Sequence, residues 1–209
     1  MQNYLRLLEN NKTWAQHVTE ENPDYFKRQL GKQTPHYLFI GCSDSRVPAN
    51  ILTGTEAGEM FVHRNIAGQA HPNDLNLLSV LQYAVEVLDV KHILVCGHYE
   101  CGGVRAAATD EHFGLVDTWL AGIRHLRRMH QRELDAITDE TLRLNRLTEL
   151  SVLQQVYNLS FTSVVRQAWE RGRRPLIHGL VYSIGDGYLK ELVRGVDCPE
   201  RAEELAPRL

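Results

Sequence analysis

The sequence predicts an α/β fold in which a mostly parallel central β-sheet is flanked by helices. Short apolar runs of strand length recur near residues 37, 60, 93 and 178. Longer stretches between these runs space their apolar residues as on one face of a helix. Strands that alternate with helices are typical of a parallel sheet covered by helices. We expect a single domain over residues 1–209, because 209 residues with 43% hydrophobic content can form one sizeable core.

Residues 1–30 predict an amphipathic helical arm. We expect this arm to be used in dimerisation, because its apolar face has no obvious partner within a compact sheet. The α/β core is expected over residues 33–187, and residues 188–209 form a C-terminal segment. The apolar residues of the arm are Tyr4, Leu5, Leu8, Trp14 and Val18.

Capping and turn signals predict the remaining elements in order. Asn73 and Asp74 indicate the start of a helix, because Asn and Asp are favoured at the N-cap. Thr162 indicates the start of a later helix, which Gly172 ends. The sequence Gly-Asp-Gly at 185–187 marks a turn. The predicted helices cover approximately residues 74–88, 115–134, 138–159 and 162–172, and the last strand approximately residues 176–183.

Charge and hydropathy exclude several classes of function. The net charge of -3 and the pI near 6.4 argue against a protein that binds nucleic acid or a membrane surface. The basic run over residues 124–132 is interpreted as a solvated helix face, because acidic residues lie close to it. The chain has no run near the roughly 20 apolar residues of a membrane span, and its first residues lack the apolar core of a secretory signal. The expected compartment is the cytoplasm, where cysteines stay reduced.

Two short motifs carry the residues that suggest chemistry. Cys42-Ser-Asp-Ser-Arg46 follows one apolar run, and His98-Tyr-Glu-Cys101 follows another. Both motifs therefore lie at the carboxyl ends of predicted strands, where open parallel sheets bind their ligands. Two thiolates and one imidazole are one ligand short of a closed tetrahedral zinc site, which suggests a catalytic metal with one open position. These soft donors favour zinc over magnesium or calcium.

A structural zinc site and a redox pair are the alternatives to a catalytic metal. Structural zinc usually has four Cys or His ligands, often in close pairs, and Cys42 has no such partner two to four residues away. A thioredoxin-like redox site is disfavoured because the sequence contains no C-x-x-C. The other two cysteines, Cys96 and Cys198, are interpreted as ordinary packed residues.

Three sequence blocks together resemble the β-class carbonic anhydrases. They are Cys-Ser-Asp-Ser-Arg-Val-Pro at 42–48, Gly-Glu-Met-Phe-Val-His-Arg-Asn-Ile-Ala at 58–67 and Cys-Gly-His-Tyr-Glu-Cys-Gly-Gly at 96–103. The resemblance extends from about Gln33 to about Gly187. It implies reversible hydration of CO2 to bicarbonate and a proton by a zinc-bound hydroxide, which an Asp/Arg dyad orients. It also implies a homodimer or a homotetramer.

The resemblance assigns roles to individual residues. Asp44 and Arg46 are expected to form the catalytic dyad. One Zn²⁺ per subunit is expected on Cys42, His98 and Cys101. The Asp44 carboxylate could also leave Arg46 and fill the open position on the metal, which would give a closed, inactive state.

Further residues match the family's substrate pocket and regulatory site. The backbone amides of Gly102 and Gly103, at the start of a predicted helix, are placed to meet the negative charge that develops on CO2. The family's bicarbonate regulatory site matches Arg64 and Tyr182, but Phe39 stands where that site has a Trp, and phenylalanine has no N–H to donate. The expected substrate-binding residues are Gln33, Phe61, Ile66, Tyr83, Gly102 and Gly103.

Two other functions remain open at this stage. A hydrolase of carbon disulfide or carbonyl sulfide on the same fold would have the same zinc motif, because access to the pocket would select the substrate. A zinc-binding sensor or structural module without catalysis is the other alternative. The presence of both Asp44 and Arg46 argues against the second, because a structural site does not need that pair.

Overall fold

The structure is a computed structural model that describes residues 2–172 and 175–205. The chain divides into two compact units, one up to Thr34 and one from Pro35 onward. Within the described residues, no helix combines the length and the apolar character that crossing a membrane requires.

The first unit consists of the predicted arm. It contains α1 (Gln2–Glu21) and α2 (Tyr25–Arg28). The ring of Trp14 packs edge-on against that of Phe26, with 5.6 Å between the ring centroids. The arm is helical, as predicted. No residue of α1 is buried, so its apolar side chains are at least partly exposed.

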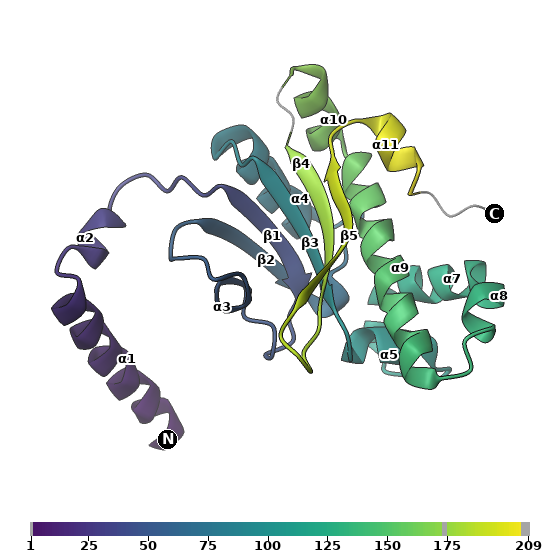
Figure 1. The fold of residues 1–209 in the computed structure, drawn as a ribbon, viewed down its shortest axis with the longest axis horizontal. Coiled ribbons are helices and arrows are strands. Elements are labelled where there is room, and N and C mark those ends of the chain that lie inside the picture. The colour runs from purple at the N-terminus through teal and green to yellow at the C-terminus, as the bar shows by residue number, and fades with distance from the viewer. Residues whose placement is uncertain (1, 173–174, 206–209) are drawn as a thin grey trace. The chain divides into compact units, whose positions relative to one another are not determined.

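The second unit is built on one five-stranded sheet in the order β2-β1-β3-β4-β5 (Figure 1). The first four strands in this order are parallel to their neighbours, and β5 runs antiparallel to β4. This arrangement confirms the predicted mostly parallel sheet. The strands are β1 (Tyr37–Cys42), β2 (Met60–Asn65), β3 (His92–His98), β4 (Leu176–Tyr182) and β5 (Leu189–Val196).

The fifth strand was not predicted, because residues 188–209 were assigned to a C-terminal segment. The sequence does carry a hairpin signal, since the Gly-Asp-Gly turn at 185–187 is followed by a run that contains Leu189, Leu192, Val193 and Val196. A register shift between β4 and β5 interrupts the regular alternation of this run. The sheet therefore continues beyond the predicted core boundary at 187.

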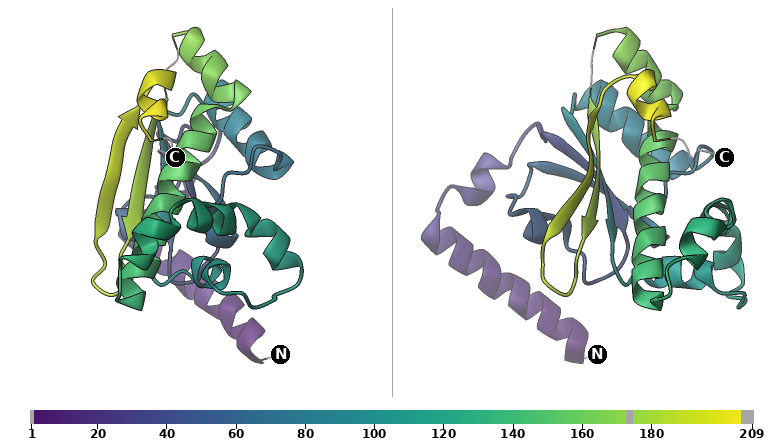
Figure 2. Two further views of the ribbon diagram at one scale, coloured as in Figure 1. Left: turned by 90° about the vertical axis from the view of Figure 1, so that its right-hand side faces the viewer. Right: turned by 45° about the vertical axis from the view of Figure 1, so that its right-hand side comes forward.

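Helices pack on both faces of the sheet and form separate cores. The long helix α9 (Glu140–Ser160) runs along one face with α4 (Leu75–Gln82), α10 (Ser163–Glu170) and α11 (Pro199–Glu203), as both views of Figure 2 show. Their apolar side chains enclose the larger core with Leu38, Ile40, Ile93 and Val95 of the strands. On the other face, Phe39 and Cys96 pack with Ala49 of α3 (Ala49–Thr53).

The predicted helix starts are confirmed by their capping bonds. The Asp74 carboxylate accepts hydrogen bonds from two backbone N–H groups of α4, and the Asp139 carboxylate accepts one from α9. Thr162 Oγ1 accepts one from α10, which ends before Gly172 at φ 75°. The helix that α4 begins passes into a π-helical turn over Tyr83–Val87, close to its predicted end.

The single helix predicted over 115–134 is wrong. The structure has three short helices there: α6 (Leu115–Trp119), α7 (Ala121–Met129) and α8 (Gln131–Asp135). A straight helix over this stretch would be about 30 Å long, so its two ends could not both face a compact core. The breaks at Leu120 and His130 allow Ile123, Leu126 and Leu134 to enter one core with Leu147.

A histidine pair on neighbouring strands makes the stability of the fold depend on pH. His178 Nδ1 accepts a hydrogen bond from the backbone N–H of Gly195, and His178 Nε2 lies 3.1 Å from His92 Nδ1. Burial, followed by the charge of His92, lowers the pKa of His178. The unfolded chain therefore binds a proton that the folded chain resists. The contribution of His178 to folding stability is expected to fall as the pH drops below about 6.5.

Replacing His178 by Gln is expected to flatten the dependence of the unfolding free energy on pH between about pH 5 and pH 8. Glutamine can replace the polar contacts of the imidazole but does not titrate. Chemical unfolding of the wild type and the variant over this pH range measures the two slopes. The exposed His125→Gln is the matched control for the loss of a histidine away from this pair. Equal slopes in the wild type and His178→Gln would contradict this account.

Candidate metal centre

The topology of the sheet brings the two motifs to one edge. Strands β1 and β3 are parallel neighbours, and they end at Cys42 and His98. The chain then turns at Glu100, whose φ is 58°, and Cys101 follows next to the other two residues. The ligand atoms of Cys42, His98 and Cys101 all lie within 4.8 Å of one another, and all three residues are buried. The predicted ligands therefore form one cluster.

The cluster fits a zinc ion by distance and by chemistry. The two sulfur atoms are 3.9 Å apart. Two ligands at about 2.3 Å from a tetrahedral zinc would be separated by about 3.8 Å. His98 Nδ1 lies 2.9 Å from the backbone carbonyl oxygen of Tyr99, so it donates its proton there. His98 Nε2 is left as a buried lone pair without a hydrogen-bond partner among the described residues. Such a group is costly to bury, and a metal ion would satisfy it.

One of the two thiols, that of Cys42, already favours loss of its proton, and the other retains it. A hydrogen bond from the Cys101 thiol lowers the pKa of Cys42 to about 4. The same contact raises the pKa of Cys101. Hydrogen bonds from the backbone N–H groups of Val104 and Gly103 offset part of this rise. A cation could replace the shared proton. Cys96 differs, because burial on the other face of the sheet raises its pKa to about 12, as expected for a packed cysteine.

Asp44 and Arg46 form a two-point ion pair beside the cluster. Arg46 Nε and Nη2 donate to the two carboxylate oxygens of Asp44 at 3.0 and 2.8 Å. This hydrogen bonding holds the pKa of Asp44 well below its usual range. Asp44 Oδ2 also lies 3.8 Å from His98 Nε2. The carboxylate is therefore ionised, faces the ligand cluster and rests on Arg46, which is the arrangement expected for the open state.

Glu100 and Arg64 hold this pair and its turn in place. The sequence did not indicate the contacts of either residue. Glu100 extends a carboxylate to within 3.6 Å of Arg46 Nη1, and its carbonyl oxygen accepts a hydrogen bond from Arg46 Nη2. Arg64 donates from Nε to the carbonyl oxygen of Cys42 and from Nη2 to that of Asp44. The guanidinium group of Arg64 on β2 therefore holds the turn that carries Cys42, a predicted metal ligand, and Asp44, the predicted catalytic carboxylate.

The structure gives Arg64 a structural role in addition to the predicted one. Strands β1 and β3 lie between Arg64 on β2 and Tyr182 on β4. Tyr182 is the register partner of His98, and its carbonyl oxygen accepts a hydrogen bond from the N–H of Tyr99. Phe39 is fully buried in the core on the same face as the half-buried Tyr182. The bicarbonate regulatory site stays a prediction.

A network of side-chain contacts extends from Tyr99, next to His98, to Lys190 of β5. The Tyr99 carbonyl oxygen fixes the His98 ring, and the Tyr99 hydroxyl donates to Glu149 Oε1 at 2.8 Å. Glu149 is buried and also binds Lys190 Nζ at 2.7 Å and Arg146 Nη1 at 3.2 Å. No motif in the sequence indicates this network, because its members lie up to 91 positions apart. Contacts of this kind orient a metal ligand.

The predicted pocket residues are brought together in part. The rings of Phe61 and Tyr83 lie 5.9 Å apart, Phe61 half-buried and Tyr83 exposed. Ile66 is also exposed, and its side chain lies close to Gly103 at the start of α5 (Gly102–Ala108). Gln33 belongs to the first compact unit, and its role stays a prediction.

Replacing Gly103 by Ala is expected to lower the turnover of the predicted CO2 hydration about tenfold without loss of the predicted metal. An added Cβ would lie 3.0 Å from Ala67 Cβ and 3.2 Å from Ile66 Cγ2, so the start of α5 would have to shift. Gly122→Ala on α7 is the matched control, because its Cβ would meet its nearest neighbours at 3.6 Å. Stopped-flow assays and metal analysis of both variants check this result. Equal turnover in the two variants would contradict a close fit at Gly103.

Comparison with known proteins identifies relatives over most of the chain. The family model of the carbonic anhydrases matches residues 37–189. A carbonic anhydrase of Emericella nidulans is 46% identical over 198 residues, which cover 95% of this chain and 86% of that protein. A carbonic anhydrase of Pseudomonas aeruginosa is 38% identical over 173 residues, which cover 80% of this chain and 77% of that protein.

Solved structures agree with these relatives. A tetrameric β-carbonic anhydrase from the filamentous ascomycete Sordaria macrospora superposes with a TM-score of 0.89 at 41% identity, over 94% of this chain and all of that one (100%). The Coccomyxa β-carbonic anhydrase in complex with acetazolamide gives a TM-score of 0.91 at 37% identity, over 95% of this chain and 90% of that one. The likeness therefore covers both the fold and the sequence.

Proposed function

Because the chain belongs to the β-class carbonic anhydrases and is a carbonate dehydratase, we propose that it interconverts CO2 and bicarbonate at one Zn²⁺ held by Cys42, His98 and Cys101. The observation that carries this proposal is the buried Nε2 of His98, which has no hydrogen-bond partner in the described part of the chain and lies next to two sulfur atoms that are 3.9 Å apart. Three protein ligands leave the fourth tetrahedral position open, as catalytic zinc sites do.

Zn²⁺ bound there would supply the Lewis acidity that makes hydroxide available near neutral pH. The chain's own residues then orient the reactants. Asp44 has no proton to give, so its carboxylate accepts a hydrogen bond from the attacking water species and directs the oxygen lone pair at the CO2 carbon. Arg46 keeps that carboxylate ionised and, by the two-point contact, in one orientation.

The start of α5 is the proposed donor to the CO2 oxygens. The N–H of Gly103 acts on the Cys101 sulfur, which leaves the neighbouring Gly102 as our candidate donor. The exposed ring of Tyr83 and the half-buried ring of its neighbour Phe61 would form the apolar wall for CO2, which is neutral and apolar. As CO2 becomes bicarbonate, one C–O bond forms and one C=O π bond breaks, its electron pair moving to the CO2 oxygen. The O–H bond that water loses releases a proton to solvent buffer.

Assembly and compartment are proposed from weaker observations. The Sordaria macrospora relative is tetrameric, and α1 presents exposed apolar side chains, so we assign a homo-oligomer to this chain and favour a tetramer. Free cysteines at the metal centre suit a reducing compartment, which favours the cytoplasm. The matched relatives and structures are carbonic anhydrases, which favours CO2 over carbon disulfide or carbonyl sulfide.

Stopped-flow CO2 hydration by the zinc-loaded protein tests this function, with the metal content of the same sample determined. Turnover that is proportional to zinc content and rises towards alkaline pH is expected, because two thiolate ligands donate charge to the metal and keep the pKa of its water above that of the best-known zinc hydrase. Full zinc content without CO2 turnover at any pH would overturn the proposal.

A further inference from the structure

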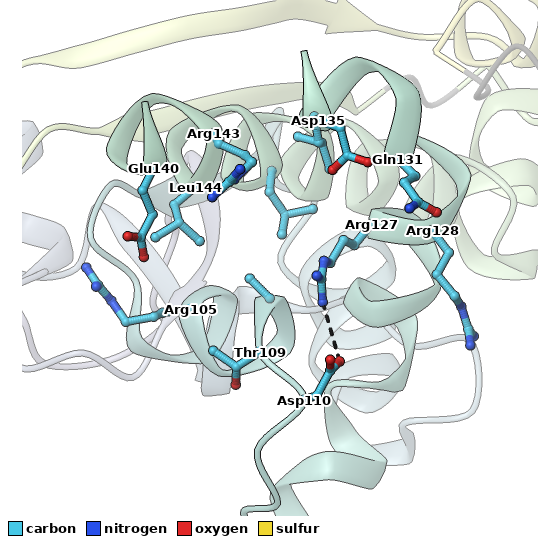
Figure 3. Close-up of a pocket in the computed structure, with 13 residues that line it drawn as sticks. Arg105, Thr109, Asp110, Arg127, Arg128, Gln131, Asp135, Glu140, Arg143 and Leu144 are labelled. Atoms are coloured by element: carbon cyan, nitrogen blue, oxygen red, sulfur yellow. Dashed lines mark ion pairs between the residues drawn. The ribbon is translucent and has the colours of Figure 1, made fainter. Parts of the chain in front are cut away.

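One cavity of the structure is lined by residues that do not belong to the metal centre. It has a volume of about 430 Å³ and lies between α5, α7, α8 and the first turns of α9 (Figure 3). None of the predicted ligand, dyad, substrate or regulatory residues lines it. Sites for small molecules have volumes of about 300 to 1,000 Å³, so the cavity is large enough for a small organic ligand.

Part of the lining is apolar. Leu134 of α8 and Leu147 of α9 are buried, and Leu144 and Ala108 are half-buried. These side chains come from three different helices, which hold them in place from separate directions. A ligand with an apolar body would remove the exposed part of this lining from water, which is favourable.

The remaining lining is charged, with an excess of guanidinium groups. Four arginines line the cavity, against the three carboxylates of Asp110, Asp135 and Glu140, which leaves one net positive charge. Arg127 pairs with Asp110 at 3.8 Å, the dashed contact in Figure 3. The arginines are Arg105, Arg127, Arg128 and Arg143.

Arg143 is the best placed of these for a ligand. It is half-buried, and Figure 3 shows its guanidinium group beside Leu144 on the inner side of α9. Among the described residues, the side chains of Arg143 and Arg105 have no ion-pair or hydrogen-bond partner, and only their backbone groups are bonded. A guanidinium group that is partly removed from water without a partner has unused donors, and its planar fork matches a carboxylate at two points.

We propose that this cavity binds a small organic carboxylate with an apolar body. The carboxylate pairs with Arg143, and the apolar body packs against Leu134, Leu144 and Leu147. The site is independent of the zinc chemistry proposed above, because it shares no residue with the metal centre.

A methyl NMR titration of the zinc-loaded protein, labelled at its leucine methyl groups, tests this site with benzoate as the ligand. We expect saturable binding with a Kd below about 10 mM. The chemical shifts of the methyl groups of Leu134, Leu144 and Leu147 should change on binding. Benzamide lacks the charge and acetate lacks the apolar body, so each should bind about tenfold more weakly or worse.

Two variants separate this cavity from other anion sites. Arg143→Leu should weaken benzoate binding by about tenfold to a hundredfold, because it removes the charged hydrogen bonds. The matched control is Arg132→Leu, which removes an exposed arginine of α8 that does not line the cavity and should leave the affinity unchanged. Both variants should keep CO2 turnover, which checks their folding.

Three results would overturn the proposal. If benzoate binds Arg143→Leu as tightly as it binds the wild type, then it binds at another place, for example at the zinc. Equal affinities for benzoate and benzamide would remove the role of the carboxylate. Absence of shifts at Leu144 and Leu147 in the wild type would reject the site even if the Arg143 variant fails to fold.

Discussion

Replacing Cys101 by Ser is expected to reduce zinc content to a small fraction of one ion per subunit and CO2 turnover by about three orders of magnitude or more. Serine keeps the size of the side chain but not the thiolate that binds zinc. Without the metal, no group in the cluster can supply hydroxide at neutral pH. Metal analysis and stopped-flow assays of the purified variant measure both effects.

Cys198→Ser is the matched control for this change. Cys198 is half-buried before α11 and belongs to no ligand cluster among the described residues. The control should keep its zinc and its turnover. Loss of zinc in both variants would show that the effect of Cys101→Ser comes from general misfolding, and full zinc content in Cys101→Ser would reject Cys101 as a ligand.

Replacing Asp44 by Asn is expected to lower kcat/KM for CO2 hydration about a hundredfold while zinc stays bound. Asparagine has the shape of aspartate but presents one acceptor oxygen and one NH2 group, so it can neither keep both contacts with Arg46 nor orient the attacking species as a carboxylate does. A uniform loss across the pH range would fit a role in orientation.

The matched control for Asp44 is Asp89→Asn, which changes an exposed aspartate paired with Lys91. Its φ of 55° is one that asparagine tolerates well. This variant should hydrate CO2 at the wild-type rate. An Asp44→Asn variant with full zinc content and unchanged kcat/KM would contradict the proposed role of the Asp44/Arg46 dyad.

The cluster of ligands could be predicted from the sequence because each part of it follows from local rules. Cys42 and His98 end apolar runs, and the carboxyl ends of neighbouring parallel strands meet at one edge of the sheet. Asp44 and Arg46 lie in the same short turn as Cys42, so their pairing needed no knowledge of distant contacts. The helix caps at Asp74 and Asp139 are equally local.

The features that the sequence did not reveal depend on contacts between distant segments. Arg64 reaches the Cys42 turn from the neighbouring strand, and Glu149 reaches Tyr99 from α9 across 50 positions. The breaks at Leu120 and His130 arise because the helix must fold back onto the core, which periodicity alone does not encode. Two walls of the cavity beside Arg143 are formed by α7 and α8, which the break at His130 separates, so the cavity could not be predicted either.

Zinc K-edge X-ray absorption on the zinc-loaded protein near neutral pH tests the central claim most directly. The account predicts two sulfur ligands at about 2.3 Å, one imidazole nitrogen at about 2.0 Å and one further light-atom ligand at the open position. The variant Asp44→Asn should show the same set of zinc ligands, because the Asp44 carboxylate contacts Arg46. A shell with four protein ligands of Cys and His type, or with fewer than two sulfur atoms, would contradict the account.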